Sequence, residues 1–208
     1  MKRSPSTCSA WESLRDQVRN GDVLAFSGKG NLSEFIKWAS SSRYSHVGIL
    51  LRLPVNGDTR VFILESTTQL DLQDEFDRRV ISGVQMHLVS KRLAAYEGEV
   101  WYVPIADRYQ YEDQAIAWAL DSEVKHRPYD YVQALGAAAD FLDRFGLTNA
   151  PDFDKLFCSE FVARIDEIGL GLTPMSFPDY FGGAPNASEV LPSQVVSAKH
   201  RGIPIKLT

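Results

Sequence analysis

The sequence is poor in cysteine, with only Cys8 and Cys158 among its 208 residues. Two cysteines cannot build the framework of several disulfide bonds that holds many small secreted domains together. The chain must therefore be stabilised by a hydrophobic core, and its length is enough for one domain with such a core. Its 44% of hydrophobic and 24% of charged residues are typical of a globular protein.

Long apolar stretches are absent as well. No run approaches the roughly 20 residues that a membrane-spanning helix needs, so we expect no transmembrane segment. The first twenty residues, MKRSPSTCSAWESLRDQVRN, are polar and mixed in charge and lack the apolar centre of a secretory signal peptide. We therefore expect synthesis in the cytoplasm without a signal peptide, and export only by a leaderless route.

The sequence also lacks the basic stripe that nucleic-acid-binding domains carry. Its formal net charge is -5 and its pI is about 5.4, and its arginines are mixed with acids, as in DEFDRRV at 74–80. The histidines at His46, His87, His126 and His200 do not have metal-ligand spacing with each other or with the cysteines. We expect no nucleic-acid partner, no metal site and no cofactor.

Alternating apolar residues predict an antiparallel sheet in the first half of the chain. A first strand is expected at 21–26, and the clearest signal is a hairpin in which 45–53 and 60–67 flank an Asn-Gly turn. Further strands are predicted at 83–89 and 100–105.

Helical patterns dominate the second half. They lie at 111–124, 129–146 and 158–168, where Gly146 and Gly169 are expected to end the last two helices, and two earlier ones lie at 11–19 and 31–42. The tail, rich in proline and glycine, is expected to be mostly irregular. The sequence thus predicts an α+β fold with a single domain over 21–208, preceded by an N-terminal segment, 1–20, with a short helix.

Cys158 lies at the predicted start of a helix, in FCSEFVARI. The free N–H groups of a helix N-terminus favour a thiolate, and the same groups, the N–H of Cys158 among them, can bind an oxyanion. Phe157, Phe161, Val162 and Ile165 are expected to pack this helix onto the sheet. Cys158 is therefore a candidate nucleophile, and the competing interpretation is a small buried hydrophobic side chain.

His46 begins an otherwise apolar strand, in YSHVGILL. If the hairpin turns at Asn56-Gly57, Gly48 faces Glu65, and Glu65 becomes a diagonal neighbour of His46 on one face of the sheet. A carboxylate beside an imidazole fixes its tautomer and raises its basicity, so Glu65 is a candidate partner for His46 as a base.

Other interpretations of these residues stay open. Asp71 or Asp74 is an alternative partner for His46, and Glu65 would then be a surface acid at a strand end. His87, His126 and His200 are expected to be surface or structural residues, and Cys8 is expected to be an incidental thiol.

These motifs together resemble a known family. GDVLAFSGKG, IKWASSSRYSHVGILL, FILES, PYDY and FCSEFVARI, in this order, resemble the circularly permuted branch of the NlpC-type papain-like cysteine peptidases and amidases, in particular its YiiX-like group. The resemblance implies a papain-like fold with the cysteine helix packed against a small sheet. It implies Cys158 as nucleophile, His46 as general base and Glu65 as the residue that orients His46, with Tyr44 lining the substrate pocket.

The resemblance also implies a metal-independent cysteine hydrolase that cleaves amide bonds in peptidoglycan peptides. Since no leader is visible, the enzyme would process imported wall fragments, be a phage lytic component, or be delivered as a toxin with a secretion-machine or immunity partner. One alternative is a lipid-directed acyl hydrolase or acyltransferase with the same triad, which needs an apolar channel for which LGAAADFL at 135–142 is a candidate. A second alternative is a catalytically inactive binding module.

Overall fold

The computed structural model of the protein describes residues 5–28, 41–68, 72–125, 127–128 and 157–207. Six strands form one sheet in the order β4-β3-β2-β1-β5-β6, and all neighbouring strands are antiparallel. Their bounds are β1 Val23–Ser27, β2 His46–Val55, β3 Asp58–Thr67, β4 Gly83–Leu88, β5 Glu99–Val103 and β6 Ile205–Lys206. The expected α+β class is therefore observed.

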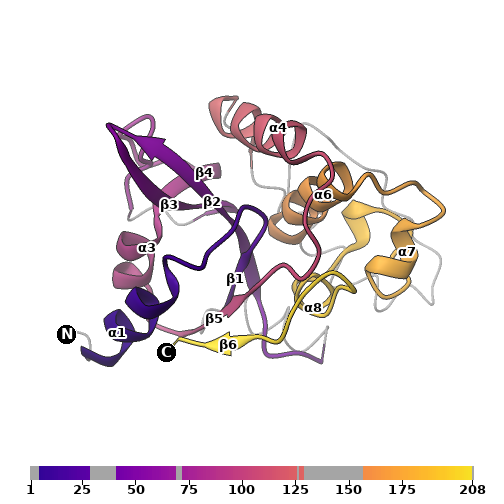
Figure 1. The fold of residues 1–208 in the computed structure, drawn as a ribbon, viewed down its shortest axis with the longest axis horizontal. Coiled ribbons are helices and arrows are strands. Elements are labelled where there is room, and N and C mark those ends of the chain that lie inside the picture. Colours follow the sequence, from indigo (N-terminus) through magenta and orange to yellow (C-terminus); the bar gives the residue numbers. More distant parts are fainter. Residues whose placement is uncertain (1–4, 29–40, 69–71, 126, 129–156, 208) are drawn as a thin grey trace.

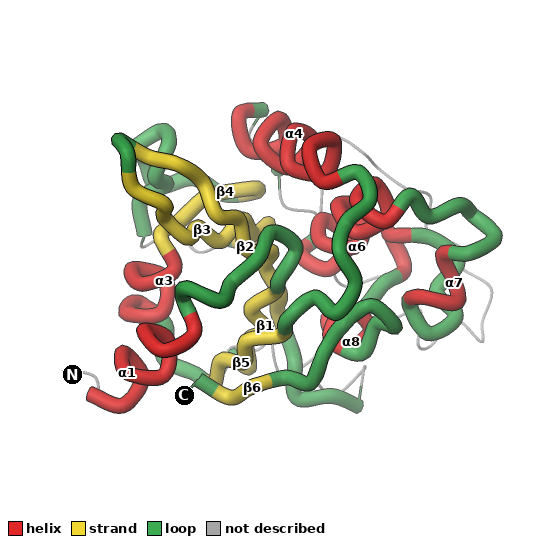
Figure 2. The backbone as a smooth tube through the Cα atoms, in the orientation of Figure 1, coloured by secondary structure: helices red, strands yellow, loops and turns green. Residues whose placement is uncertain are grey.

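Helices cover both faces of this sheet (Figures 1 and 2). The described helices are α1 Pro5–Leu14, α3 Val89–Ala95, α4 Glu112–Val124, α6 Cys158–Leu170, α7 Phe177–Tyr180 and α8 Pro192–Val196, with a 3₁₀ turn, η1, at Ala187–Glu189. In Figure 1, α1 and α3 lie on one side of the sheet, and α4, α6 and α8 lie on the other. None of the helices in the described part of the chain is long and apolar enough to cross a membrane.

The strands supply two separate hydrophobic cores because their side chains alternate between the two faces. Ile49 and Leu64 point into the larger core, which contains the buried residues of α6. Leu50 and Ile63 point into the smaller core, with Leu93 of α3. A strand residue is thus assigned to the α6 face or to the α3 face by its position in this alternation.

The β2–β3 hairpin has the register that its turn predicts. Ile49 pairs with Leu64 and Val55 pairs with Asp58, without an intervening bulge. Asn56 and Gly57 both have positive φ, 52° and 88°, as the central residues of a tight two-residue hairpin turn require. Because this register is maintained along the hairpin, Glu65 lies on the same face of the sheet as Gly48, as expected.

Some predicted boundaries were wrong. The first helix spans Pro5–Leu14 rather than 11–19. The tail after α6 is mostly irregular, as expected, but it also contains the short elements α7, η1, α8 and β6. Helix α6 does not stop at Gly169 but ends at Gly171, which takes the left-handed conformation with φ 65°. Gly169 lies inside the helix, and its lack of a side chain leaves room for the ring of Tyr109, 2.6 Å from where a Cβ would be.

Other predictions agree with the structure or lie outside it. The strands expected at 21–26, 83–89 and 100–105 correspond to β1, β4 and β5, and the helix expected at 111–124 is α4. The helix expected at 129–146 lies outside the described residues, as do His126 and Asp71. The helix expected at 31–42 also lies outside them, except for 41–42, which are not helical.

Candidate active site

Cys158 is the first residue of α6, and the sequence around it explains why the helix begins there. Phe157 is extended, with φ -80° and ψ 155°, and its backbone N–H donates to Glu160 Oε2 at 3.4 Å. This is the arrangement in which an acidic side chain in the first turn satisfies a free N–H at a helix start. Phe161 and Val162 are fully buried in the core between α6 and the sheet, as expected. The nucleophile candidate is 1% exposed and is held on a rigid helix.

His46 is the first residue of β2, and its side chain lies beside that of Cys158. Its Nε2 is 2.6 Å from Glu65 Oε2, and its side chain remains 17% exposed while that of Glu65 is fully buried. Because Glu65 accepts the Nε2 proton, Nδ1 of the neutral ring is left for the thiol of Cys158. The ring of Phe26 packs 5.5 Å from the His46 ring and restricts its orientation.

The structure therefore brings together the three residues that the sequence singled out as a triad. His46 and Glu65 come from neighbouring strands on the α3 face of the sheet, and Cys158 comes from the helix on the opposite face. The three meet where β2 begins. A thiol, an imidazole and a carboxylate in this order are the groups that an activated cysteine nucleophile needs.

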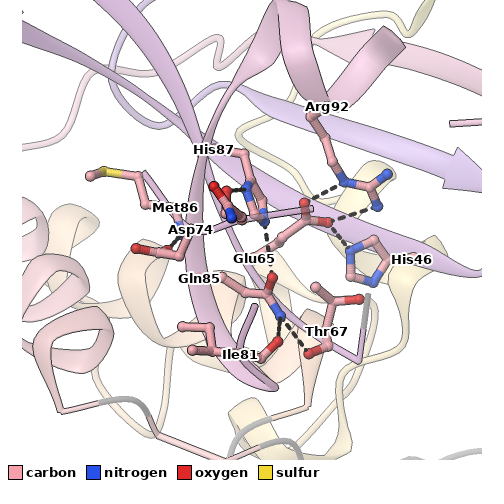
Figure 3. A network of polar contacts seen from close by, with 10 residues as sticks. His46, Glu65, Thr67, Asp74, Ile81, Gln85, Met86, His87 and Arg92 are labelled. Carbon is pink, nitrogen blue, oxygen red and sulfur yellow. Dashed lines mark hydrogen bonds and ion pairs between the residues drawn. The ribbon is translucent and has the colours of Figure 1, made fainter. Parts of the chain in front are cut away.

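Arg92 of α3 is a site residue that the sequence did not reveal. Its Nε donates to Glu65 Oε1 at 2.5 Å and its Nη2 donates to Glu65 Oε2 at 3.1 Å (Figure 3). The guanidinium therefore binds the carboxylate in a bidentate manner. Nothing in VSKRLAA distinguishes this arginine from a surface residue. The available signal is Glu65 itself, because a carboxylate on a core-facing strand position requires a charged partner.

The charges of the site set its protonation. Burial alone would lower the pKa of His46, but the adjacent Cys158 and the Glu65 carboxylate raise it to about 9. Burial would raise the pKa of Glu65, but Arg92 and His46 hold it well below the usual range. Near neutral pH, His46 is therefore an imidazolium beside the negatively charged carboxylate of Glu65.

A further polar layer lies behind Glu65 on β4. Gln85, opposite Glu65 in the sheet, donates its amide to Thr67 O at 3.0 Å and to Ile81 O at 2.9 Å. Its Oε1 is therefore turned toward His87 Nε2, at 2.9 Å (Figure 3). His87 is fully buried and thus structural rather than a surface residue, and burial lowers its pKa.

The alternative partners for His46 are occupied elsewhere or lie outside the described residues. Asp74 is fully buried and accepts backbone N–H groups from Phe76, Asp77 and Met86 at 2.6–2.9 Å, so it organises its own loop. Tyr44 packs edge-on against Trp101, with ring centroids 5.1 Å apart. It lines an open groove together with residues of the C-terminal segment, such as Ser193 and Ile203, and its role in binding substrate stays a prediction.

A second buried network fixes α6 to the C-terminal segment. Asp166, two turns after Cys158, accepts a hydrogen bond from Tyr109 Oη at 2.6 Å and pairs with Arg201 Nη2 at 2.5 Å. His200 Nε2 lies 3.1 Å from the same carboxylate and is fully buried, so His200 is structural as well. This network holds the helix that carries Cys158 in place.

The arrangement of possible metal ligands is a further feature of the described residues. Within the described ranges, no group of three or more His, Cys, Asp or Glu side chains is placed to hold a metal ion.

Gly48 allows the side chain of Glu65 to lie where it does. A Cβ at position 48 would lie 2.6 Å from Ile63 Cδ1 and 3.0 Å from Glu65 Cβ. We expect Gly48→Ala to lower the free energy of unfolding by about 1–3 kcal/mol through overpacking, measured by urea denaturation. Gly57→Asn is the control, because no atom lies within 4 Å of that Cβ position and asparagine tolerates positive φ. Equal stability of both variants would show that Glu65 does not depend on Gly48.

Comparison with known proteins gives a structural similarity but no match in sequence. No known family model matches the sequence, and no curated protein matches it either. Among solved structures, the chain is similar to the crystal structure of the metalloprotein YiiX from Escherichia coli O157:H7. The identity is 17% and the TM-score 0.46, over 91% of this chain and 97% of that chain. The α+β class follows from the structure itself, whereas the papain-like fold and membership of the NlpC-type family stay predictions.

Proposed function

We propose that the protein is a cysteine hydrolase that cleaves amide bonds through Cys158, His46 and Glu65. The observation that carries the proposal is the position of His46. Its Nε2 is fixed by Glu65 at 2.6 Å, while Cys158, at the N-terminus of α6, lies beside it and raises its pKa. A buried cysteine that serves only for packing does not require an imidazole held in this way.

The reaction follows from these groups. The thiolate of Cys158 attacks the carbonyl carbon, and the new C–S bond gives a tetrahedral oxyanion that faces the N–H groups at the start of α6. As the C–N bond breaks, the His46 imidazolium gives its proton to the leaving amine and a thioester remains. Water then attacks the thioester, His46 takes its proton, and cleavage of the C–S bond releases the acid and restores the pair.

The proposed substrate is a peptide amide of peptidoglycan. It is supported by the order of YSHVGI before CSEFV with an acid between them, which resembles the permuted NlpC-type arrangement. The test is digestion of purified peptidoglycan with the wild-type protein and with Cys158→Ala, followed by mass spectrometry of the products. Fragments from the wild type alone would support the proposal, and their masses would identify the bond.

The proposed chemistry needs no metal, and this is tested separately. Product formation is expected to be unchanged after dialysis against EDTA. Loss of activity that returns with an added divalent cation would contradict a cysteine mechanism of this type. If neither protein digests peptidoglycan, phospholipid vesicles are the next substrate, and an acyl thioester on Cys158 would then indicate an acyl hydrolase or acyltransferase.

Delivery to a rival's periplasm is proposed as the route to this substrate. If it is correct, expression with an added periplasmic leader is expected to lyse a bacterial host, whereas cytoplasmic expression is tolerated. The Cys158→Ala variant with the same leader is the control. Toxicity in the cytoplasm alone would overturn this proposal.

A further inference from the structure

We propose that Arg92 is a positioning residue of the site, which keeps Cys158 and His46 charged by balancing the buried carboxylate of Glu65. The inference rests on the proposed function, because it concerns how the same nucleophile is activated. It assigns a function to a residue outside the triad.

The contacts of Arg92 show that its charge is held in one place. The Arg92 side chain is 2% exposed and that of Glu65 is fully buried, so this ion pair is shielded from solvent. The guanidinium lies over the ring of Phe26, 4.7 Å from its centroid, and over that of Tyr96, at 5.1 Å. Two hydrogen bonds to Glu65 complete this setting. An arginine fixed on all these sides cannot move away when the charge of its partner changes.

The site then consists of four groups of alternating charge. They are the thiolate of Cys158, the imidazolium of His46, the carboxylate of Glu65 and the guanidinium of Arg92, and their charges cancel. Without Arg92, the three remaining groups would carry one net negative charge in a buried site, which costs free energy that uptake of a proton relieves. The thiolate takes this proton, because a thiol has a much higher ordinary pKa than a carboxyl group.

The other titratable groups near Glu65 do not replace Arg92. Burial lowers the pKa of His87, so it is neutral at physiological pH. Burial raises the pKa of Tyr96 to about 12, so it is neutral as well. Glu160, the acid closest to Cys158 on α6 itself, is turned to the backbone N–H of Phe157. Neither His87 nor Tyr96 supplies a second positive charge to the carboxylate.

The test is a pH titration of the Cys158 thiolate by its ultraviolet absorption, with Cys158→Ala subtracted. This measurement needs no substrate and no access of a reagent to the 1% exposed residue. Arg92→Met is expected to raise the midpoint of thiolate formation by about one pH unit or more. Arg92→Lys keeps the charge and is expected to keep the midpoint. Glu65→Gln leaves an excess positive charge and is expected to lower it.

The double variant Arg92→Met/Glu65→Gln distinguishes charge balance from structural support. It removes both buried charges, so its midpoint is expected to return to within about half a pH unit of the wild type. If Arg92→Met does not fold, the comparison of Glu65→Gln with the double variant measures the same effect. Equal midpoints in that comparison, or an unchanged midpoint in folded Arg92→Met, would overturn the proposal.

Arg201→Met is the matched control. It breaks a second buried arginine–carboxylate pair, between Arg201 and Asp166 of α6. Asp166 lies about 12 Å along the helix from Cys158. Arg201→Met is expected to lower stability without moving the thiolate midpoint, and an equal shift in this variant would also overturn the proposal. If Cys158 of the wild type titrates like a free thiol, the proposed function is contradicted. If Cys158 of the wild type forms a thiolate at lower pH than a free thiol but its midpoint does not change in Arg92→Met, only the inference about Arg92 is contradicted.

Discussion

Replacing His46 by alanine is expected to slow amide cleavage by a factor of about 10²–10⁴, because no other group takes its part in proton transfer. The loss of activity should be largest in the pH range in which the wild-type His46 is protonated and can donate its proton to the leaving amine. Since Cys158 and Glu65 raise the pKa of His46 to about 9, the wild type is expected to retain its activity up to about pH 9 and to lose it above. This alkaline limb should be missing from the residual activity of the variant.

The measurement is kcat/KM against pH for the wild type, His46→Ala and Glu65→Gln. Glu65→Gln is the matched comparison, because its amide oxygen can still accept the Nε2 proton of His46, and it is expected to lose less activity than His46→Ala. A His46→Ala protein that is folded and retains most of the wild-type activity would rule out His46 as the base. Equal losses in both variants would show that the geometry of the pair, and not the base alone, limits the rate.

A second large effect is expected in stability, from a pair of buried acids that are not part of the triad, Glu123 and Asp74. Glu123 of α4 is 1% exposed, and its Oε1 has no hydrogen-bond partner. Burial is the main cause that raises the pKa of Glu123 to about 7, and the negative charge of the nearby Asp74 adds to it. We expect Glu123→Gln to stabilise the protein by about 1–3 kcal/mol at about pH 8, because an amide can donate to Asp74 without carrying a second charge.

The sign of the pH dependence follows from the raised pKa. The unfolded chain releases the Glu123 proton near pH 4.5, the ordinary value for this carboxyl, whereas the folded protein keeps it until about pH 7. Between these values the folded state binds more protons, so the stability of the wild type falls as pH rises, and the loss is complete above about pH 7. At about pH 5 the variant should therefore have nearly wild-type stability.

Urea unfolding at both pH values checks this prediction. Asp113→Asn is the control, because it removes an exposed carboxylate from the first turn of the same helix. If Glu123→Gln gives the same difference from the wild type at both pH values, titration of Glu123 is not the cause. A destabilised variant at about pH 8 would mean that the carboxylate is stabilised by contacts that an amide cannot make.

The part of the site that the sequence predicted depends on local geometry. The Asn56-Gly57 turn fixes the parity of the hairpin, and parity alone places Glu65 on the same face as His46. The apolar spacing around Cys158 likewise predicts a helix that starts there and packs on the sheet. These inferences needed only residues that are close in sequence.

The rest depends on packing between distant segments, which a sequence pattern does not encode. Arg92 reaches Glu65 because α3 packs on the strand face that carries it. Gly169 looks like a helix end, but its lack of a side chain accommodates the ring of Tyr109, and Gly171 ends the helix instead. His87 and His200 have no feature in the sequence that marks them as fully buried.

The ties between α6 and the C-terminal segment also determine when a newly made chain can bring Cys158 to His46. His46 and Cys158 are 112 positions apart, and α6 is held by Ser159, which donates to Val190 O, and by the Asp166–Arg201 pair. The β2–β3 hairpin can form early during translation because its contacts are local, whereas docking of α6 must wait for residues near 200 to leave the ribosome. Until then Cys158 and His46 stay apart, and the site is incomplete.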